Sequence, residues 1–214
     1  MSELTAVDIL IDPDETMLAR ARQENERMRA SYPGGFALDE HHQPHITTLQ
    51  RYVRTADLEQ VLDAVQATIE SVDMSKVRLT AKRLAHMDGG GGLGVTAIVV
   101  DPGPEVLDLQ ARLIEAIRPF TGSGGTADAY VRTEAEPEIN DLTLEYIENY
   151  VPEHSGANFI AHVTVGLATL DDLSEIEAEP FDELTFGPAG MSVYQLGNNG
   201  TAARHIKSWT VAAP

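Results

Sequence analysis

The 214-residue chain contains no cysteine. Disulfide bonds, cysteine-ligated zinc, iron–sulfur clusters and thiol nucleophiles are therefore excluded. Long hydrophobic runs are also missing, because no apolar stretch approaches the ~20 residues that a membrane helix requires. The first residues, MSELTAVDILIDPDE, carry no Lys or Arg ahead of a short apolar run and contain no signal-peptide core. We expect a cytoplasmic protein that does not associate with membranes.

Basic residues are scarce, with 15 Lys and Arg against 34 Asp and Glu, which gives a formal net charge of −19. Such a surface repels a polyphosphate backbone and argues against bulk binding of nucleic acid, whereas a small anion in a local pocket is compatible with it. Hydrophobic residues make up 43% of the chain, so the sequence is that of an ordinary globular protein. Its length predicts one domain or two small lobes, without indicating an oligomeric state.

Apolar runs and turn residues predict strands, and apolar residues at helical spacing predict helices. In the first half the predicted order is a strand over 6–11, a helix over 13–30, a strand over 45–52, a helix from 55 or 57 to 69, and a strand over 77–84. After four glycines at 89–92, the second half has a strand over 93–100, helices over 105–120 and 139–150, a strand over 159–167, a helix over 170–177 and extended chain from 184. A Gly-Asn-Asn-Gly turn at 197–200 predicts a hairpin between 193–196 and 203–211.

The two halves match in the order of their elements. Asp-Pro pairs at 12–13 and 101–102 are offset by 89 residues, and His45 and His162 by 117. The two offsets differ by 28 residues, about the length of a Gly-, Glu- and Pro-rich insertion over 121–156. The sequence therefore predicts an α+β fold of duplicated β-α-β units in one bilobal domain over 1–214, with halves at about 1–88 and 93–214 that can exchange strands.

Each half carries a His-x-Thr motif in the corresponding predicted strand, at His45 and Thr47 and at His162 and Thr164. Side chains alternate along a strand, so each histidine shares a face with its threonine. Two imidazoles and two hydroxyls in one cleft suit displacement at phosphorus: one histidine takes a proton from the attacking oxygen, and the other gives a proton to the leaving oxygen. The hydroxyls can stabilise the non-bridging oxygens. The scheme requires no metal or cofactor, and it leaves open which histidine is the acid.

Around these motifs the sequence resembles the two-histidine (2H) phosphoesterase superfamily, and within it the LigT-like 2′-5′ RNA ligase and cyclic phosphodiesterase branch. The similar segments are PHITTLQRY, ANFIAHVTVGL and SVYQLGNNGTA. The resemblance implies antiparallel sheets facing a central cleft with helices outside, and metal-independent cleavage of 2′,3′-cyclic or 2′-5′ phosphodiesters. It also implies that His45, Thr47, His162 and Thr164 are catalytic. The chain departs from the pattern through the insertion and through Thr48, which replaces an apolar residue at a position that we expect to face outward.

Three further residues are candidates for substrate binding. Tyr194 is expected on a strand beside the second histidine strand, where it either stacks on a base or fills the core. Arg204 offers a phosphate-binding fork or balances acidic neighbours. His42 is expected in a solvated loop that lines the cleft.

The other histidines have weaker functional interpretations. A metal cluster at 41, 42 and 45 is disfavoured because Pro44 prevents helical spacing of the rings and no acidic cluster completes a ligand set. His86 and His154 are expected to be surface residues.

Two hypotheses follow from the sequence. The first is a phosphodiesterase acting on a small nucleotide or a short RNA end. The alternative is a non-catalytic module that binds a nucleotide or a partner on the same fold.

Overall fold

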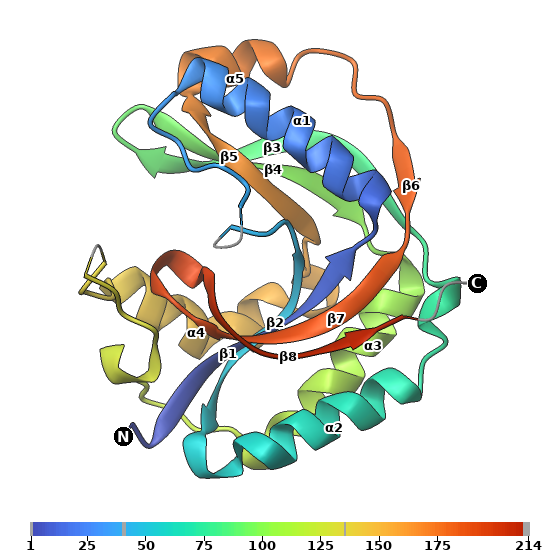
Figure 1. Cartoon of the computed structure of the whole chain (residues 1–214), viewed down its shortest axis with the longest axis vertical. Helices are drawn as coiled ribbons and strands as arrows, with labels where there is room; N and C mark the ends of the chain where they lie inside the picture. The colour runs from blue at the N-terminus through green and yellow to red at the C-terminus, as the bar shows by residue number, and fades with distance from the viewer. Residues whose placement is uncertain (1, 40–41, 135, 212–214) are drawn as a thin grey trace.

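The computed structural model describes residues 2–39, 42–134 and 136–211. The described residues form two antiparallel four-stranded sheets, with strand orders β2-β1-β7-β8 and β5-β4-β3-β6 (Figure 1). The first sheet consists of β1 (Leu4–Pro13), β2 (Ile46–Arg54), β7 (Pro188–Leu196) and β8 (Ala202–Thr210). The second consists of β3 (Leu79–Gly90), β4 (Leu93–Asp101), β5 (His162–Thr169) and β6 (Leu184–Phe186). The predicted α+β fold is confirmed.

Each sheet combines strands from both halves of the sequence. β3 ends the first half but pairs with β4, and β7 from the second half pairs with β1. The helices are α1 (Glu15–Ser31), α2 (Leu58–Glu70), α3 (Gly103–Ile117), α4 (Asp141–His154) and α5 (Leu170–Ile176). In Figure 1 the two sheets curve toward each other, with α1 and α5 outside the second sheet and α2 and α3 outside the first.

The elements begin and end where local chemistry requires it. Asp14 caps α1 by accepting hydrogen bonds from the backbone N–H groups of Thr16 and Met17. α3 ends at Ile117, earlier than predicted, because Pro119 lacks the N–H that another helical turn needs, and residues 118–120 form a 3₁₀ turn instead. Within the described ranges, no helix combines the length and the apolar character of a membrane span.

The inserted segment has its own structure and packs against the first sheet. Its helix α4 contacts β2. A small apolar cluster joins the two through Tyr52 of β2, Tyr130 and Ile147, all buried. The hydroxyls of Tyr52 and Tyr130 lie 2.5 Å apart and form a hydrogen bond. This pair ties the insertion to the strand that follows the first histidine motif.

Candidate active site

The two histidine motifs lie at equivalent ends of their strands. His45 directly precedes β2, and His162 is the first residue of β5. The two strands contact each other although they belong to different sheets. The charge of His45 is also one of the causes that lower the pKa of His162. The contact between β2 and β5 places the two histidine motifs in neighbouring strands, as the sequence predicts.

Both imidazoles are held in the same way by the backbone. The Nδ1 atom of His45 lies 2.7 Å from the carbonyl oxygen of Gln43, and the Nδ1 atom of His162 lies 2.8 Å from that of Ile160. A carbonyl oxygen only accepts hydrogen bonds, so each Nδ1 must donate. Each Nε2 is therefore the nitrogen left to exchange a proton with a ligand, and the repeat of this contact fixes the same tautomer in both motifs.

A β-bulge follows the threonine of each motif. In the pairing of β1 with β2, Leu10 lies opposite Thr47 and Ile9 opposite Leu49, so Thr48 is an extra residue. In the pairing of β4 with β5, the register skips Val165 in the same way. Such bulges change the direction of the strand and re-aim its side chains, and they are frequent beside active sites. The two motifs therefore share a backbone irregularity that the residue pattern does not predict.

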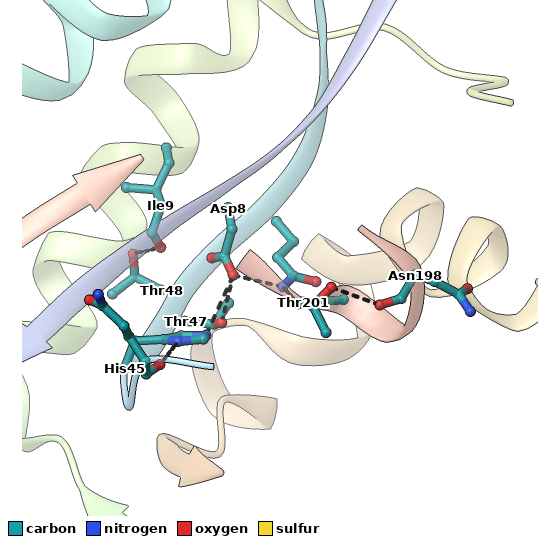
Figure 2. Close-up of polar contacts among 10 residues, drawn as sticks. Asp8, Ile9, His45, Thr47, Thr48, Asn198 and Thr201 are labelled. Atoms are coloured by element: carbon teal, nitrogen blue, oxygen red, sulfur yellow. Dashed lines mark hydrogen bonds and ion pairs between the residues drawn. The ribbon is translucent and has the colours of Figure 1, made fainter. Parts of the chain in front are cut away.

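Thr48 does not face outward, and that expectation is wrong. The residue is fully buried, and its hydroxyl donates to the carbonyl oxygen of Ile9 at 2.6 Å. The polar side chain at this buried position thus has a backbone acceptor within hydrogen-bond distance (Figure 2).

Asp8 lies beneath the first motif and is a site residue that sequence reasoning missed. Its Oδ2 atom accepts hydrogen bonds from Thr47 at 3.0 Å and from Gln50 at 2.9 Å, and lies 3.9 Å from the Nε2 atom of His45 (Figure 2). Thr47 and Gln50 are three residues apart and share a face only because of the intervening bulge. The signal in the sequence was a single carboxylate in the apolar run Ala6–Ile11.

The environment of Asp8 disfavours its charge. Its side chain is completely buried, and its Oδ1 atom has no hydrogen-bond partner among the described residues. Burial raises the pKa of Asp8, against the opposing effects of the His45 charge and of the bonds from Gln50 and Thr47. Burial also raises the pKa of Asp12, four residues along β1, although its Oδ2 accepts a bond from Ser192 at 2.6 Å.

His162 has a different environment. Burial lowers its pKa, and the charges of His45 and His154 lower it further, while the bond to the Ile160 carbonyl acts in the opposite direction. The bulge beside it is held by Asn25 of α1, whose amide donates to the carbonyl of Val165 at 2.8 Å. The protein therefore favours the neutral form of His162.

Tyr194 lies in the site, but next to the first motif rather than the second. It belongs to β7, which pairs with β1 in the sheet of His45, so the expected neighbourhood with the second histidine strand is wrong. The cause is the exchange of strands between the halves. A small pocket beside His45 is lined by Leu10, Asp12, Gln43, His45, Tyr194 and Ala202.

The structure does not bring Arg204 and His42 together with this pocket. The ring of His205 meets that of Tyr194 edge to face, with centroids 5.2 Å apart. Arg204 precedes His205 in β8 and therefore points to the other side of the sheet. His42 stacks on Phe36 at 4.8 Å in the loop ahead of β2, and His41 lies outside the described residues.

His154 lies at the end of helix α4 with its side chain 36% exposed, as expected for a surface residue. Its ring packs against Tyr146 and Tyr150 of the same helix, with centroids 4.4 and 5.6 Å away. The charge of His154 contributes to the lowered pKa of His162. The inserted segment thus brings a helix with three aromatic rings into contact with β2.

Comparison with known proteins gives the fold. No family model matches the chain, and no curated protein matches its sequence. The solved structure of TT0787 of Thermus thermophilus has a TM-score of 0.58 to this chain, with 13% sequence identity over 98% of this chain and 99% of that chain. The chain has the fold of TT0787.

Other solved structures are similar over the whole length. E. coli LigT complexed with phosphate has a TM-score of 0.47 and 13% identity, covering 99% of both chains. Kluyveromyces marxianus Usb1 has a TM-score of 0.46 and 8% identity, covering 98% of both chains. The likeness to TT0787 spans both sheets and the insertion, so the whole chain takes part in the shared fold.

Proposed function

We propose that the chain is a two-histidine phosphoesterase that cleaves 2′,3′-cyclic phosphates or 2′-5′ phosphodiesters of nucleotides or short RNA ends without a metal. The observation that carries the proposal is the repeated geometry of His45 and His162. Each ring donates from Nδ1 to the carbonyl two residues before it, at 2.7 and 2.8 Å. Both therefore offer Nε2 for proton exchange, which is what general acid–base catalysis at phosphorus needs.

The electrostatics suggest a role for each histidine. His162, whose pKa is lowered by burial and by the His45 charge, acts as the general base. His45 has the carboxylate of Asp8 3.9 Å from its Nε2 atom and acts as the general acid. Water attacks phosphorus as His162 takes its proton, the bond from phosphorus to one ribose oxygen breaks, and His45 protonates that oxygen. A cyclic phosphate is thereby opened to a phosphomonoester, and a 2′-5′ phosphodiester is split into a phosphomonoester and a free hydroxyl.

The two threonines would stabilise the phosphoryl oxygens. Thr164 shares its strand face with His162, two residues away. Thr47 has one proton, which in the structure it donates to Asp8. It becomes a donor to the substrate when its hydroxyl turns from Asp8 toward a phosphoryl oxygen, which leaves the Asp8 carboxylate to the bond from Gln50 and to His45. Asp8 is then a positioning residue for both Thr47 and His45.

The test is cleavage of 2′,3′-cyclic nucleotides and short 2′-5′ oligonucleotides by the purified protein in EDTA. His45→Ala and His162→Ala are each expected to lower kcat by roughly 10²- to 10⁴-fold. His86→Ala is the matched control, since His86 pairs with Glu177 on the second sheet, and it should retain wild-type turnover. Turnover lost with the chelator, or unchanged by either active-site substitution, contradicts the proposal. Binding without cleavage by the wild-type protein would favour a non-catalytic module.

A further inference from the structure

Three rings of helix α4 form a cluster along one side of the helix. Tyr146, Tyr150 and His154 follow one another at four-residue spacing, which places them on one face. The rings of Tyr146 and Tyr150 meet edge to face with centroids 5.8 Å apart, and His154 packs against both. Tyr150 is only 3% exposed and anchors the cluster, whereas Tyr146 is 40% exposed. The cluster therefore offers one partly open aromatic ring on a rigid base.

The ring cluster lies on the helix that packs beside the first histidine motif. α4 packs against β2, the strand that begins beside His45. The charge of Asp8 is among the causes that raise the pKa of both tyrosines, and that of Tyr146 reaches about 12. Gly156, two residues after His154, donates its N–H to the side-chain oxygen of Gln110, whose amide donates to the carbonyl of Thr48. These contacts place α4 beside the first motif, and the effect of the His154 charge on His162 agrees with that placement.

Exposed apolar side chains occur here, although the chain carries a net charge of −19. Five large hydrophobic side chains are exposed among the described residues, and three of them belong to α4 or to the segment between α4 and β5. Leu142 and Tyr146 are neighbours on α4 at four-residue spacing. Ile160 directly precedes the second motif, and its carbonyl holds the His162 ring. Apolar surface beside a polar site indicates that an uncharged, flat part of a ligand binds there.

We propose that Tyr146, supported by His154, forms the platform on which the base of the substrate stacks while its phosphodiester lies between His45 and His162. The inference rests on the proposed phosphoesterase function and narrows it, because it excludes base-free phosphodiesters as preferred substrates. A base stacks on an aromatic face with little dependence on sequence, so the platform selects nucleotides as a class. The insertion would then supply substrate recognition that the duplicated β-α-β units lack.

The experiment compares two substrates and two substitutions. The substrates are a 2′,3′-cyclic nucleotide and the 2,3-cyclic phosphate of methyl riboside, which has no base. Tyr146→Leu keeps apolar volume but removes the ring, and Tyr146→Phe keeps the ring. We expect Tyr146→Leu to raise KM for the cyclic nucleotide by about 5- to 150-fold, with little change in kcat. KM for the base-free substrate should stay close to that of the wild type, and Tyr146→Phe should restore tight binding of the nucleotide.

A binding measurement keeps the platform separate from catalysis. The fluorescence of 2-aminopurine riboside 2′,3′-cyclic phosphate falls when its base stacks, and His162→Ala slows its cleavage during titration. Quenching that is lost in His162→Ala/Tyr146→Leu and kept in His162→Ala/Tyr146→Phe supports the platform, even if the wild-type protein cleaves no phosphodiester. Equal losses for both substrates, or equal quenching by the Leu and Phe variants, would overturn it.

Discussion

The difference in free energy of unfolding between Asp8→Asn and the wild type should shift in favour of the variant as the pH rises. Asp8 is fully buried in the central strand β1, and its Oδ1 atom has no partner among the described residues. An asparagine of the same shape can place its amide oxygen at the Oδ2 position and keep the bonds from Thr47 and Gln50. The substitution therefore removes a titrating carboxyl group while it preserves the packing.

The sign follows from the raised pKa of Asp8 in the folded state. The unfolded chain releases this proton near pH 3.8, and the folded protein releases it only at higher pH. The stability that Asp8 contributes is thus fully present below pH 3.8 and is lost as the pH rises through the raised folded value. Asparagine does not titrate. The free energy of unfolding of Asp8→Asn minus that of the wild type should therefore rise by at most about 1.4 kcal/mol per pH unit between pH 3.8 and the raised folded pKa.

The assay is urea unfolding of both proteins from pH 3 to 7, with Asp172→Asn as the matched control. Hydrogen bonds from Ser31 and Thr169 lower the pKa of Asp172, so its contribution is present above pH 3.8 and is lost as the pH falls below that value. The difference for Asp172→Asn should therefore change in the opposite direction. A difference for Asp8→Asn that is flat or falls with rising pH would refute the reasoning. We also expect Asp8→Asn to lower kcat, because His45 loses its neighbouring carboxylate.

Three further predictions concern the insertion, the base and the surface charge. Tyr52→Phe should destabilise the fold by about 1–3 kcal/mol in chemical denaturation, since it removes the shorter of two hydrogen bonds of the buried Tyr130 hydroxyl. Adding Tyr130→Phe should recover part of the loss, and a simple sum of the two effects would count against the pair. In a plot of kcat/KM against pH, the fall on the acid side should have its midpoint below about pH 6.5, because the pKa of His162 is lowered. A midpoint above that pH, or a midpoint that does not change when His162 is substituted, would argue against His162 as the base. Added salt should lower the ratio of kcat/KM for a cyclic mononucleotide to kcat/KM for long RNA with a cyclic end, since the Debye length falls from about 10 Å at 0.1 M to 3 Å at 1 M. A ratio that does not depend on salt would contradict the idea that the acidic surface repels long RNA.

The regular elements could be predicted because each has a local cause. The apolar spacing of 58–69 gave α2, and the Gly-Asn-Asn-Gly turn gave the hairpin of β7 and β8. The partner of each strand could not be predicted in the same way. The sequence of residues 188–196 does not indicate that they pair with β1 rather than with a strand of their own half. That choice depends on how the two apolar faces are buried together, and it moved Tyr194 to the first motif.

The placement of the candidate site residues could be predicted where it depends on residue type, and it was missed where it depends on backbone irregularity. Alternation along a strand placed His45 with Thr47, because the period of two holds between them. It failed one residue later, where the bulge buries Thr48 and turns Gln50 toward Asp8. A bulge depends on the register of the neighbouring strand, which one strand's sequence does not contain. The equivalent bulge at Val165 was missed for the same reason.

The central claim is that His45 and His162 act together in one displacement at phosphorus. Its most direct test is kcat for a 2′,3′-cyclic nucleotide in EDTA, measured for His45→Ala, His162→Ala and the double variant. Each single substitution should lower kcat by roughly 10²- to 10⁴-fold, and the double variant should be little slower than the worse single one, because residues that act as a unit are not additive. A single variant with wild-type turnover, or two losses that multiply in the double variant, would contradict the account.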